Sequence, residues 1–448
     1  MITPLKSILY AFAAAVFVSC ASPSESIPKL KDGVLDQSDT LTLGLPQIPG
    51  LVRITVFAPG GPFGTDRPDS ADPTIGTDRP FSAAAPVGTY INNVLLTHFG
   101  GRYYCMWQRS ERDEDTPDTR VEYAVSSGGR LWSSPRILAL PTDSTFVSPG
   151  GWIQRGDSLA AVLNYVCSAD RAKGGTAWYS VTKDGSTWTT PAPVTMADGS
   201  PVDGIFEQDP MVVPGKGSCG GMPDRVGHDG GALGHDGSIV GRDGRTVIPG
   251  LTGNLGHDGL RTVGAVHFRP GLTVGPVYTD DPSALSGWRR ASFPEGEGKP
   301  LEPSQFRAPD GTLVMLFRDQ ASSFVKLASV SVDGGLSWTA PVRTNIPDAR
   351  TKQCAGTLPD GRPFWVGCPT GNKSRRILVL AVASDGCLFD RAWMIAGPTD
   401  LPPRRFPGRY KTLGYNYPKA TVIDGILWMS LSVNKEEAVL FRVPLEGV

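Results

Sequence analysis

A short turn signature recurs along the chain at nearly even spacing, and it limits the possible folds more than any other feature. Its clearest copy is SVDGGLSW at 331–338, and degenerate copies occupy 126–132, 182–188, 278–288 and 384–389. The closing aromatic residues fall at 132, 188, 288, 338 and 389, which leaves gaps of 56, 100, 50 and 51 residues. Since the gap of 100 equals two periods, the spacing predicts one silent copy near residue 238. Six repeats of about fifty residues predict an all-β fold, a six-bladed β-propeller of four-stranded antiparallel blades.

The signature itself has a structural explanation. Asp and Ser side-chain oxygens accept hydrogen bonds from the backbone N–H groups of a tight turn, and Gly adopts backbone angles that other residues resist. The closing Trp packs the turn against its blade. We therefore expect the signature to identify the scaffold and not the site of any chemistry.

The composition agrees with this fold and excludes some classes of partner. The 448 residues include 54 Gly and 40 Pro, which suits many short strands joined by turns. There are 43 basic and 44 acidic residues, a formal net charge of −1. This balance indicates no nucleic-acid partner and no membrane-surface patch. We expect a monomer.

The N-terminus has the pattern of a targeting segment. Lys6 precedes an apolar run over 8–18 and small residues at 19–22. This predicts a secretory signal peptide over 1–20, because the run is too short for a comfortable membrane span. The run VSC ending at Cys20 also resembles a bacterial lipobox, which would make Cys20 the lipidated first residue of the mature protein. The alternative is an ordinary signal peptide with a chance Cys. Both predict export, and the first predicts a membrane attachment only through the lipid.

The remaining chain divides into two parts. Residues 21–89 are expected to be a tether and low-complexity segment, since GTDRP occurs at both 64–68 and 76–80. Strand-like alternation starts near Tyr90, so the propeller is predicted over 90–448. The last strand-like run, 439–443, is expected to close the ring with the first blade.

Two features leave metal and disulfide chemistry open. The window 215–262 contains Gly-His-Asp-Gly three times, and such residues suit either calcium or tight hairpin turns. Turns are favoured, so no metal and no cofactor is predicted. Cys354 and Cys368 flank a turn, and they are either a disulfide or two buried free thiols.

The signature, chain length, export signal and blade number together resemble the sialidase superfamily, six-bladed propellers whose glycosidases cleave acidic sugars. The resemblance covers about 90–448. It implies a Tyr nucleophile activated by a Glu, a loop Asp as acid/base, and three arginines that grip the substrate carboxylate. These residue types suit the chemistry: guanidinium pairs bidentately with carboxylate, and a neutral phenol approaches an anionic sugar with less repulsion than a carboxylate would.

Matching positions can be named for the nucleophile, its base and two of the arginines. Glu302 lies 16 residues before Arg318, which resembles the family's Glu, strand and Arg. The third Arg is matched best by Arg376. Tyr417 takes the nucleophile position, with Tyr415 in reserve. Each residue also has a plain structural explanation, as a solvated acid, a structural ion pair or a strand tyrosine.

The resemblance implies the acid/base in the charged loop that follows the first strand of blade one. Its sequence from residue 108 is QRSERDED. Asp113 is the first choice for the acid/base and Asp115 the second. Arg109, at the start of this loop, is assigned to substrate binding.

One departure from the family concerns the first arginine. The opening strand, TYINNVLL from residue 89, contains no Arg. Two arginines would make one fewer charge-assisted contact with the substrate carboxylate than the family's three, a loss of roughly 1.5–3 kcal/mol of binding free energy. Asn92 and His98 on this strand suggest a subsite rebuilt for a different sugar, and Lys411 and Lys419 are candidates for replacement charge.

These residues lead to three functional hypotheses. The first is an exported glycosidase that removes terminal acidic sugars, sialic acid or a related sugar, from glycans. The second is a propeller lyase or other glycosidase acting on uronic-acid glycans, with His98, His228, His235 or His257 moving the proton. The third is a non-catalytic carbohydrate-binding lipoprotein.

Overall fold

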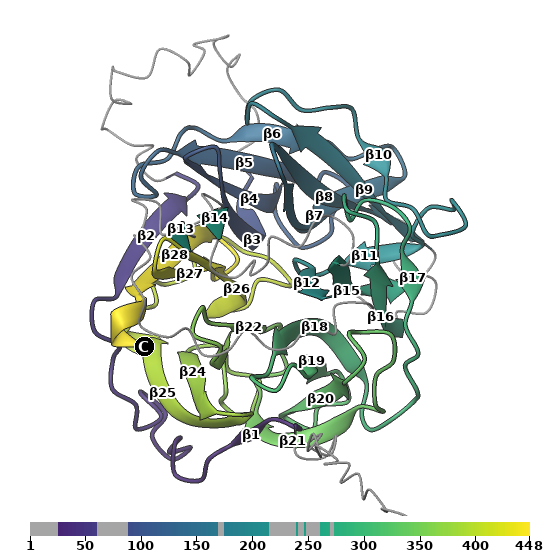
Figure 1. Cartoon of the computed structure of the whole chain (residues 1–448). Coiled ribbons are helices and arrows are strands. Elements are labelled where there is room, and N and C mark those ends of the chain that lie inside the picture. The colour runs from purple at the N-terminus through teal and green to yellow at the C-terminus, as the bar shows by residue number, and fades with distance from the viewer. Residues whose placement is uncertain are drawn as a thin grey trace, which may run out of the picture.

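The computed structural model describes residues 26–60, 88–168, 174–214, 239–240, 246–247, 260–268 and 273–448. They form six antiparallel blades around a central axis, which confirms the predicted six-bladed propeller (Figure 1). Each blade starts at the axis and runs outward in successive hairpins, as the alternating, β-branched strand sequences favour.

The blades are numbered in chain order. Blade 1 contains β3 (Tyr90–Phe99), β4 (Arg102–Ser110), β5 (Arg120–Ser126) and β6 (Arg136–Ala139). Blade 2 contains β7 (Thr145–Arg155), β8 (Ser158–Cys167), β9 (Gly175–Thr182) and β10 (Ala192–Pro193). Blade 3 contains β11 (Gly204–Phe206), β12 (Met211–Pro214), β15 (Leu260–Phe268), β16 (Thr273–Thr279) and β17 (Arg289–Arg290).

The second half of the ring follows the same order. Blade 4 contains β18 (Pro300–Arg307), β19 (Leu313–Asp319), β20 (Val325–Ser331) and β21 (Val342–Pro347). Blade 5 contains β22 (Cys354–Thr357), β23 (Pro363–Gly367), β24 (Leu378–Asp385) and β25 (Leu388–Ala396). Blade 6 contains β26 (Tyr415–Ile423), β27 (Ile426–Val433) and β28 (Glu437–Pro444). The ribbon β13 (Ile239–Val240) and β14 (Thr246–Val247) and the 3-10 turns η1 (Pro398–Asp400) and η2 (Leu445–Gly447) complete the described elements.

Two strands before residue 90 belong to the propeller, contrary to the predicted boundary at that residue. The fourth strand of blade 6 is β2 (Val52–Phe57), which pairs antiparallel with β28. The ring is therefore closed by the N-terminus rather than by the first blade. In addition, β1 (Lys29–Leu30) pairs parallel with β25 at the outer edge of blade 5. Among the described residues, no helix is long and apolar enough to cross a membrane.

The turn signature has the structural role that its sequence predicts. Each copy joins the third and fourth strands of a blade. In the clearest copy, Asp333 accepts hydrogen bonds from the N–H groups of Leu336 and Ser337, both at 3.0 Å. Gly335 has a left-handed φ of 88° and lies close to Val263 of the preceding blade, so a larger residue there would clash. The turn thus joins the last two strands of its own blade and also packs against the preceding blade.

The predicted silent copy near residue 238 is wrong, although the predicted blade number is right. The copies ending at Trp188 and Trp288 belong to blades 2 and 3, which are consecutive. Only ten residues separate β10 from β11, and the extra length lies inside blade 3, between β12 and β15. The sixth blade has no signature because its fourth strand comes from the N-terminus.

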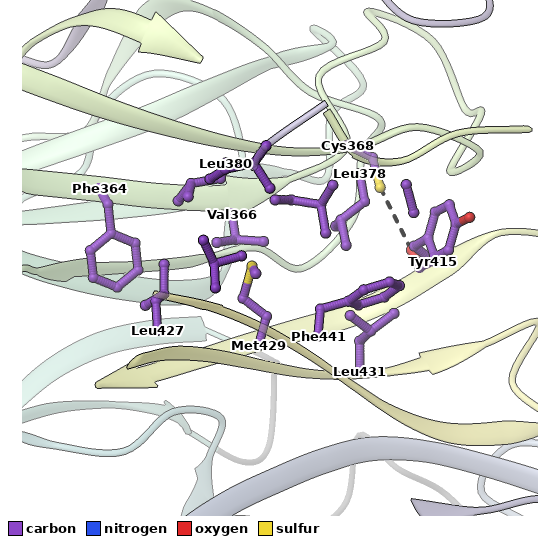
Figure 2. Close-up of a cluster of buried hydrophobic side chains, with 14 of the residues drawn as sticks. Phe364, Val366, Cys368, Leu378, Leu380, Tyr415, Leu427, Met429, Leu431 and Phe441 are labelled. Atoms are coloured by element: carbon purple, nitrogen blue, oxygen red, sulfur yellow. Dashed lines mark hydrogen bonds between the residues drawn. The ribbon is translucent and has the colours of Figure 1, made fainter. Parts of the chain in front are cut away.

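Apolar side chains fill the layers between adjacent blades. Figure 2 shows the layer between blades 5 and 6, in which Val366 and Leu380 of one sheet face Met429 and Leu431 of the other. The thiol of Cys368 lies in this layer and donates to the carbonyl of Tyr415 at 3.6 Å. Both candidate disulfide cysteines, at 354 and 368, are buried free thiols.

Candidate active site

Irregularities in the innermost strands create a site at one end of the central axis. The pairing register shifts at Asn93 in β3, at Glu302 in β18 and at Tyr417 in β26. All three residues have a left-handed φ, of 51°, 50° and 57° respectively. A bulge re-aims a side chain out of the sheet. All three lie near the start of their strands, and we call this end of the ring the upper face.

Proline explains two of these bulges. Pro303 and Pro418 follow Glu302 and Tyr417 directly, and proline in a sheet is confined to edges and bulges because it cannot donate to the ladder. A polar residue followed by Pro in an apolar strand is therefore a sequence signal for a bulge.

Glu302, Arg318 and Tyr417 come together as predicted. Arg318 donates to a carboxylate oxygen of Glu302 at 2.8 Å, and the Tyr417 phenol lies close enough to the same carboxylate to help lower its pKa. Burial opposes the charge of Glu302, yet Arg318 keeps its pKa below the ordinary value. Burial and the neighbouring Glu302 raise the pKa of Tyr417 well above its ordinary value. The site thus holds a neutral phenol beside an ionised carboxylate.

Three cations surround the ring of Tyr417. Lys352 Nζ lies 5.3 Å from the ring centroid, Lys435 Nζ 5.5 Å and the guanidinium carbon of Arg375 6.0 Å. The predicted Arg376 is exposed and has no such contact, so Arg375 replaces it as the arginine beside Tyr417. Arg375 also donates to the amide oxygen of Asn416 at 2.8 Å.

A buried network missed by the sequence analysis supports one side of the site. Lys352 donates to Glu207 at 2.7 Å and to Asn93 at 3.1 Å. Glu207 also faces His267 Nδ1 at 3.3 Å, and His267 Nε2 accepts the backbone N–H of Glu302 at 3.0 Å. Burial opposes the charge of Glu207, but Lys352 and His267 hold its pKa at about 2. Glu207 lies where the innermost strand of blade 3 is interrupted, before a proline at position 210.

A second lysine lies in the same central region. Lys419 Nζ donates to the side-chain oxygen of Gln208 at 2.5 Å and to the carbonyl of Glu207. Burial and the nearby charge of Lys352 lower the pKa of Lys419 to about 7. Lys419 is therefore buried and hydrogen-bonded to the protein, whereas the lysines beside the Tyr417 ring are Lys352 and Lys435.

The acidic loop of blade 1 approaches the site through residues other than Asp113, the first choice for the acid/base. Both carboxylate oxygens of Asp113 accept backbone N–H groups of a neighbouring loop, including that of Tyr410 at 2.9 Å. Burial opposes its charge, but these hydrogen bonds lower the pKa of Asp113, which makes it a poor proton donor. Glu114 pairs with Lys435 at 2.8 Å. Asp115, the second choice, has a left-handed φ of 53°. Burial raises the pKa of Tyr90 well above its ordinary value, and the nearby charges of Glu114 and Asp115 raise it further.

The other predicted substrate-binding residues do not reach this site. Arg109 pairs with Glu122 at 2.9 Å within blade 1. Tyr415 is a core residue, and its hydroxyl donates to a backbone carbonyl of Gly397 at 2.9 Å. His98 packs on Tyr103 at the far end of β3, because it lies five residues beyond the bulge. The structure therefore does not bring these three residues to the site.

Asn92 and its neighbour have structural roles at the opening strand. Asn92 accepts a hydrogen bond from Ser432 of blade 6 at 2.9 Å and is fully buried. Asn93 lies at the bulge, where it donates to the carbonyl of Pro149 at 2.7 Å and accepts from Lys352. Asn93 therefore bridges two blades where a substrate-binding arginine would be expected.

Some sequence-based predictions fall outside the described residues. His228, His235, His257 and Cys20 are among them. Within the described ranges, no group of three or more His, Cys, Asp or Glu side chains gathers in a way that suits a metal ion.

Comparison with protein families supports the scaffold. A model described as the BNR repeat-like domain matches residues 231–429. A search of the curated proteins finds no match.

The fold is shared with solved sialidase structures at low sequence identity. One, described as a sialidase, is 15% identical with a TM-score of 0.56; the match covers 90% of this chain and 33% of that one. The present chain thus spans about a third of that protein's length. A mutant of the NanB sialidase from Streptococcus pneumoniae is 11% identical with a TM-score of 0.54 over 84% of this chain and 72% of that one. A protein of unknown function from Dyadobacter fermentans is 12% identical, with a TM-score of 0.53 over 88% and 99%.

Proposed function

We propose that the chain, a six-bladed propeller that shares the fold of solved sialidases and matches the BNR repeat-like domain over residues 231–429, is a glycoside hydrolase acting on terminal acidic sugars. The observation that carries the proposal is the contact between the Tyr417 phenol and the Glu302 carboxylate, which is in turn paired with Arg318. Sialidases are the glycosidases that use a Tyr nucleophile. The pair lies at the upper face, where the innermost strands carry their bulged residues.

The first step would be attack by the Tyr417 oxygen on the anomeric carbon. Its proton passes to Glu302 as the C–O bond forms, because the high pKa of the phenol requires a base within hydrogen-bond reach. The cations Lys352, Lys435 and Arg375 lie around the ring and favour the negative charge that develops on it.

The leaving oxygen needs a proton at the same time. We assign this role to Asp115, the second sequence-based candidate, because it follows Glu114 in the same loop and Glu114 pairs with Lys435, which lies over the Tyr417 ring. In the second step, water displaces Tyr417 from the anomeric carbon. Asp115 accepts the proton of that water, and Glu302 returns its proton to the phenolate.

Arg375 is the best candidate for binding the substrate's acidic group. Its side chain is partly exposed and bonds to a neutral amide, and within the described part of the chain it forms no ion pair with a carboxylate. Arg318, Lys352 and Lys435 are each paired with a protein carboxylate. A single unpaired guanidinium suits one carboxylate on the sugar, bound less tightly than by three arginines.

The test is turnover of fluorogenic glycosides of sialic and uronic acids by wild-type protein and two variants. Tyr417→Phe removes the nucleophilic oxygen and should lower kcat by at least about a thousandfold. Tyr415→Phe is the matched control, since it removes a buried hydroxyl two residues away that lies outside the site. It should keep activity while losing about 1 kcal/mol of stability.

Three results would contradict the proposal in different ways. Equal activity of Tyr417→Phe and wild type would exclude Tyr417 as nucleophile. Release of an unsaturated sugar would indicate a lyase instead. Binding of acidic sugars without turnover by folded wild-type protein would indicate a carbohydrate-binding propeller.

A further inference from the structure

A basic and aromatic loop borders the candidate site on the upper face. It comprises residues 402–413, PPRRFPGRYKTL, between β25 and β26, and we call it the rim loop. It contains four basic residues and no acidic one, in a chain whose formal net charge is −1. Arg405 and Lys411 are paired with Glu436, so Arg404 and Arg409 are the positive charges that the rim loop presents beside the site.

Two carboxylates hold the backbone of the rim loop in place. Glu436 accepts hydrogen bonds from the N–H of Arg405 at 2.9 Å and of the next residue at 3.0 Å. Asp113 accepts those of Arg409 and, at 2.9 Å, of the residue after it. A loop held at both ends in this way is ordered before any ligand binds, which lowers the entropic cost of binding.

The same carboxylates place the rim loop next to the nucleophile. Glu436 follows Lys435, and Asp113 precedes Glu114. Lys435 and Glu114 pair with each other at 2.8 Å, and Lys435 also lies over the ring of Tyr417. The loop is thus attached to the residues that border the nucleophile.

The side chains that the loop presents suit an acidic carbohydrate. Tyr410 is 46% exposed, and the guanidinium of Arg409 lies 5.2 Å from its ring centroid. Arg404 and, on the facing loop, Arg112 are also exposed. Within the described residues, none of these three arginines forms an ion pair. Guanidinium groups bind carboxylate and sulfate, and an aromatic face offers an apolar surface to a sugar ring.

We propose that the rim loop binds acidic groups of the glycan chain beyond the sugar that is cleaved, so that the preferred substrate is a polyanionic glycan. Which end of the glycan lies at the rim loop rests on the function proposed above, because that function places the cleaved sugar at Tyr417. The binding of the glycan by the loop does not rest on it. Carboxylated and sulfated glycans share the chemistry that Arg112 and Arg409 recognise, and the two are separated by the choice of probe.

The test measures binding by calorimetry, without catalysis, to polygalacturonate and to heparin at two salt concentrations. Arg112→Gln combined with Arg409→Gln removes two charges but keeps the backbone N–H groups that hold the loop. We expect binding at least about tenfold weaker than that of the wild type, with a smaller salt dependence. Arg130→Gln is the control, since this exposed arginine lies in a turn signature at the opposite end of blade 1. It should bind as the wild type does.

The possible results distinguish the proposed binding from the proposed hydrolase activity. Loss of binding to polygalacturonate alone, or to heparin alone, supports the proposal and identifies the acidic group. The proposal is overturned if the wild type binds neither polymer, if the double variant binds as tightly as Arg130→Gln, or if duplex DNA binds equally well. Polymer binding that depends on these arginines, in a protein without turnover, would refute the proposed hydrolase and leave the rim loop's role intact. Thermal unfolding shows whether the double variant is folded.

Discussion

At the scale of single residues, the backbone of Glu302 is held by side chains from two other blades. Its left-handed φ and the following proline remove it from the β18–β19 ladder. His267 accepts its N–H at 3.0 Å, and Gln353 donates to its carbonyl at 3.3 Å. Both are positioning residues, because they act on the base through its main chain.

Removing the imidazole should therefore reduce catalysis without weakening substrate binding. In His267→Ala the buried N–H loses its acceptor, at a cost of about 1–3 kcal/mol. The misplaced base should lower kcat about ten- to a hundredfold while KM changes less than twofold. His267→Gln retains a side-chain acceptor and should recover most of the loss. A fall in kcat that the Gln variant does not recover would assign His267 a purely structural role.

The sequence predicted the residues that carry the proposed chemistry better than the residues that support them. Glu302, Arg318 and Tyr417 have spacings that a family resemblance can match. Glu207 and Lys352 belong to different blades and meet only through the closure of the ring, so no local pattern connects them. The choice between Arg375 and Arg376 depends on which side of the backbone each faces, and adjacent arginines give no periodic signal.

At the scale of elements, β2 is the least expected strand. It follows a weakly periodic segment and precedes a low-complexity one, and its partner β28 lies almost 400 residues away in sequence. Long-range pairing of this kind leaves no local signal. Likewise, the gap of 100 residues between turn signatures predicts a silent copy, because the extra length within blade 3 equals about one repeat.

The contribution of β2 can be measured through Phe57. This side chain is 4% exposed and stacks on Trp107 of blade 1 at 5.5 Å, so it joins blade 6 to blade 1. Phe57→Ala should lower the free energy of unfolding by about 3–5 kcal/mol. Val52→Ala, in the same strand but at a position that is 37% exposed, should change it by less than about 0.5 kcal/mol. Urea unfolding of both variants is the measurement. Equal, small effects would mean that β2 does not hold the ring closed.

At the scale of the whole molecule, the N-terminus enters the ring at the end opposite the candidate site. Lys29 begins β1 and donates its N–H to the carbonyl of Cys387, in the turn between β24 and β25. That turn joins the third and fourth strands of blade 5, as the turn signatures do in their blades. Such turns lie at the lower end of the ring, whereas the innermost strands begin at the upper face. If Cys20 carries a lipid, eight residues lie between it and β1, a span of at most about 30 Å.

This geometry predicts an anchored propeller whose upper face points away from the membrane. On expression in a bacterium, the wild type should sediment with membranes and carry a lipid-modified Cys20 in its N-terminal peptide, as measured by mass spectrometry. Cys20→Ser should appear in the soluble exported fraction. Its specific activity on a small glycoside should match that of the wild type, because the anchor lies opposite the site. Unchanged fractionation, with an unmodified Cys20, would instead indicate an ordinary signal peptide. Activity that rises sharply on release would place the site against the membrane and contradict the orientation proposed for the ring.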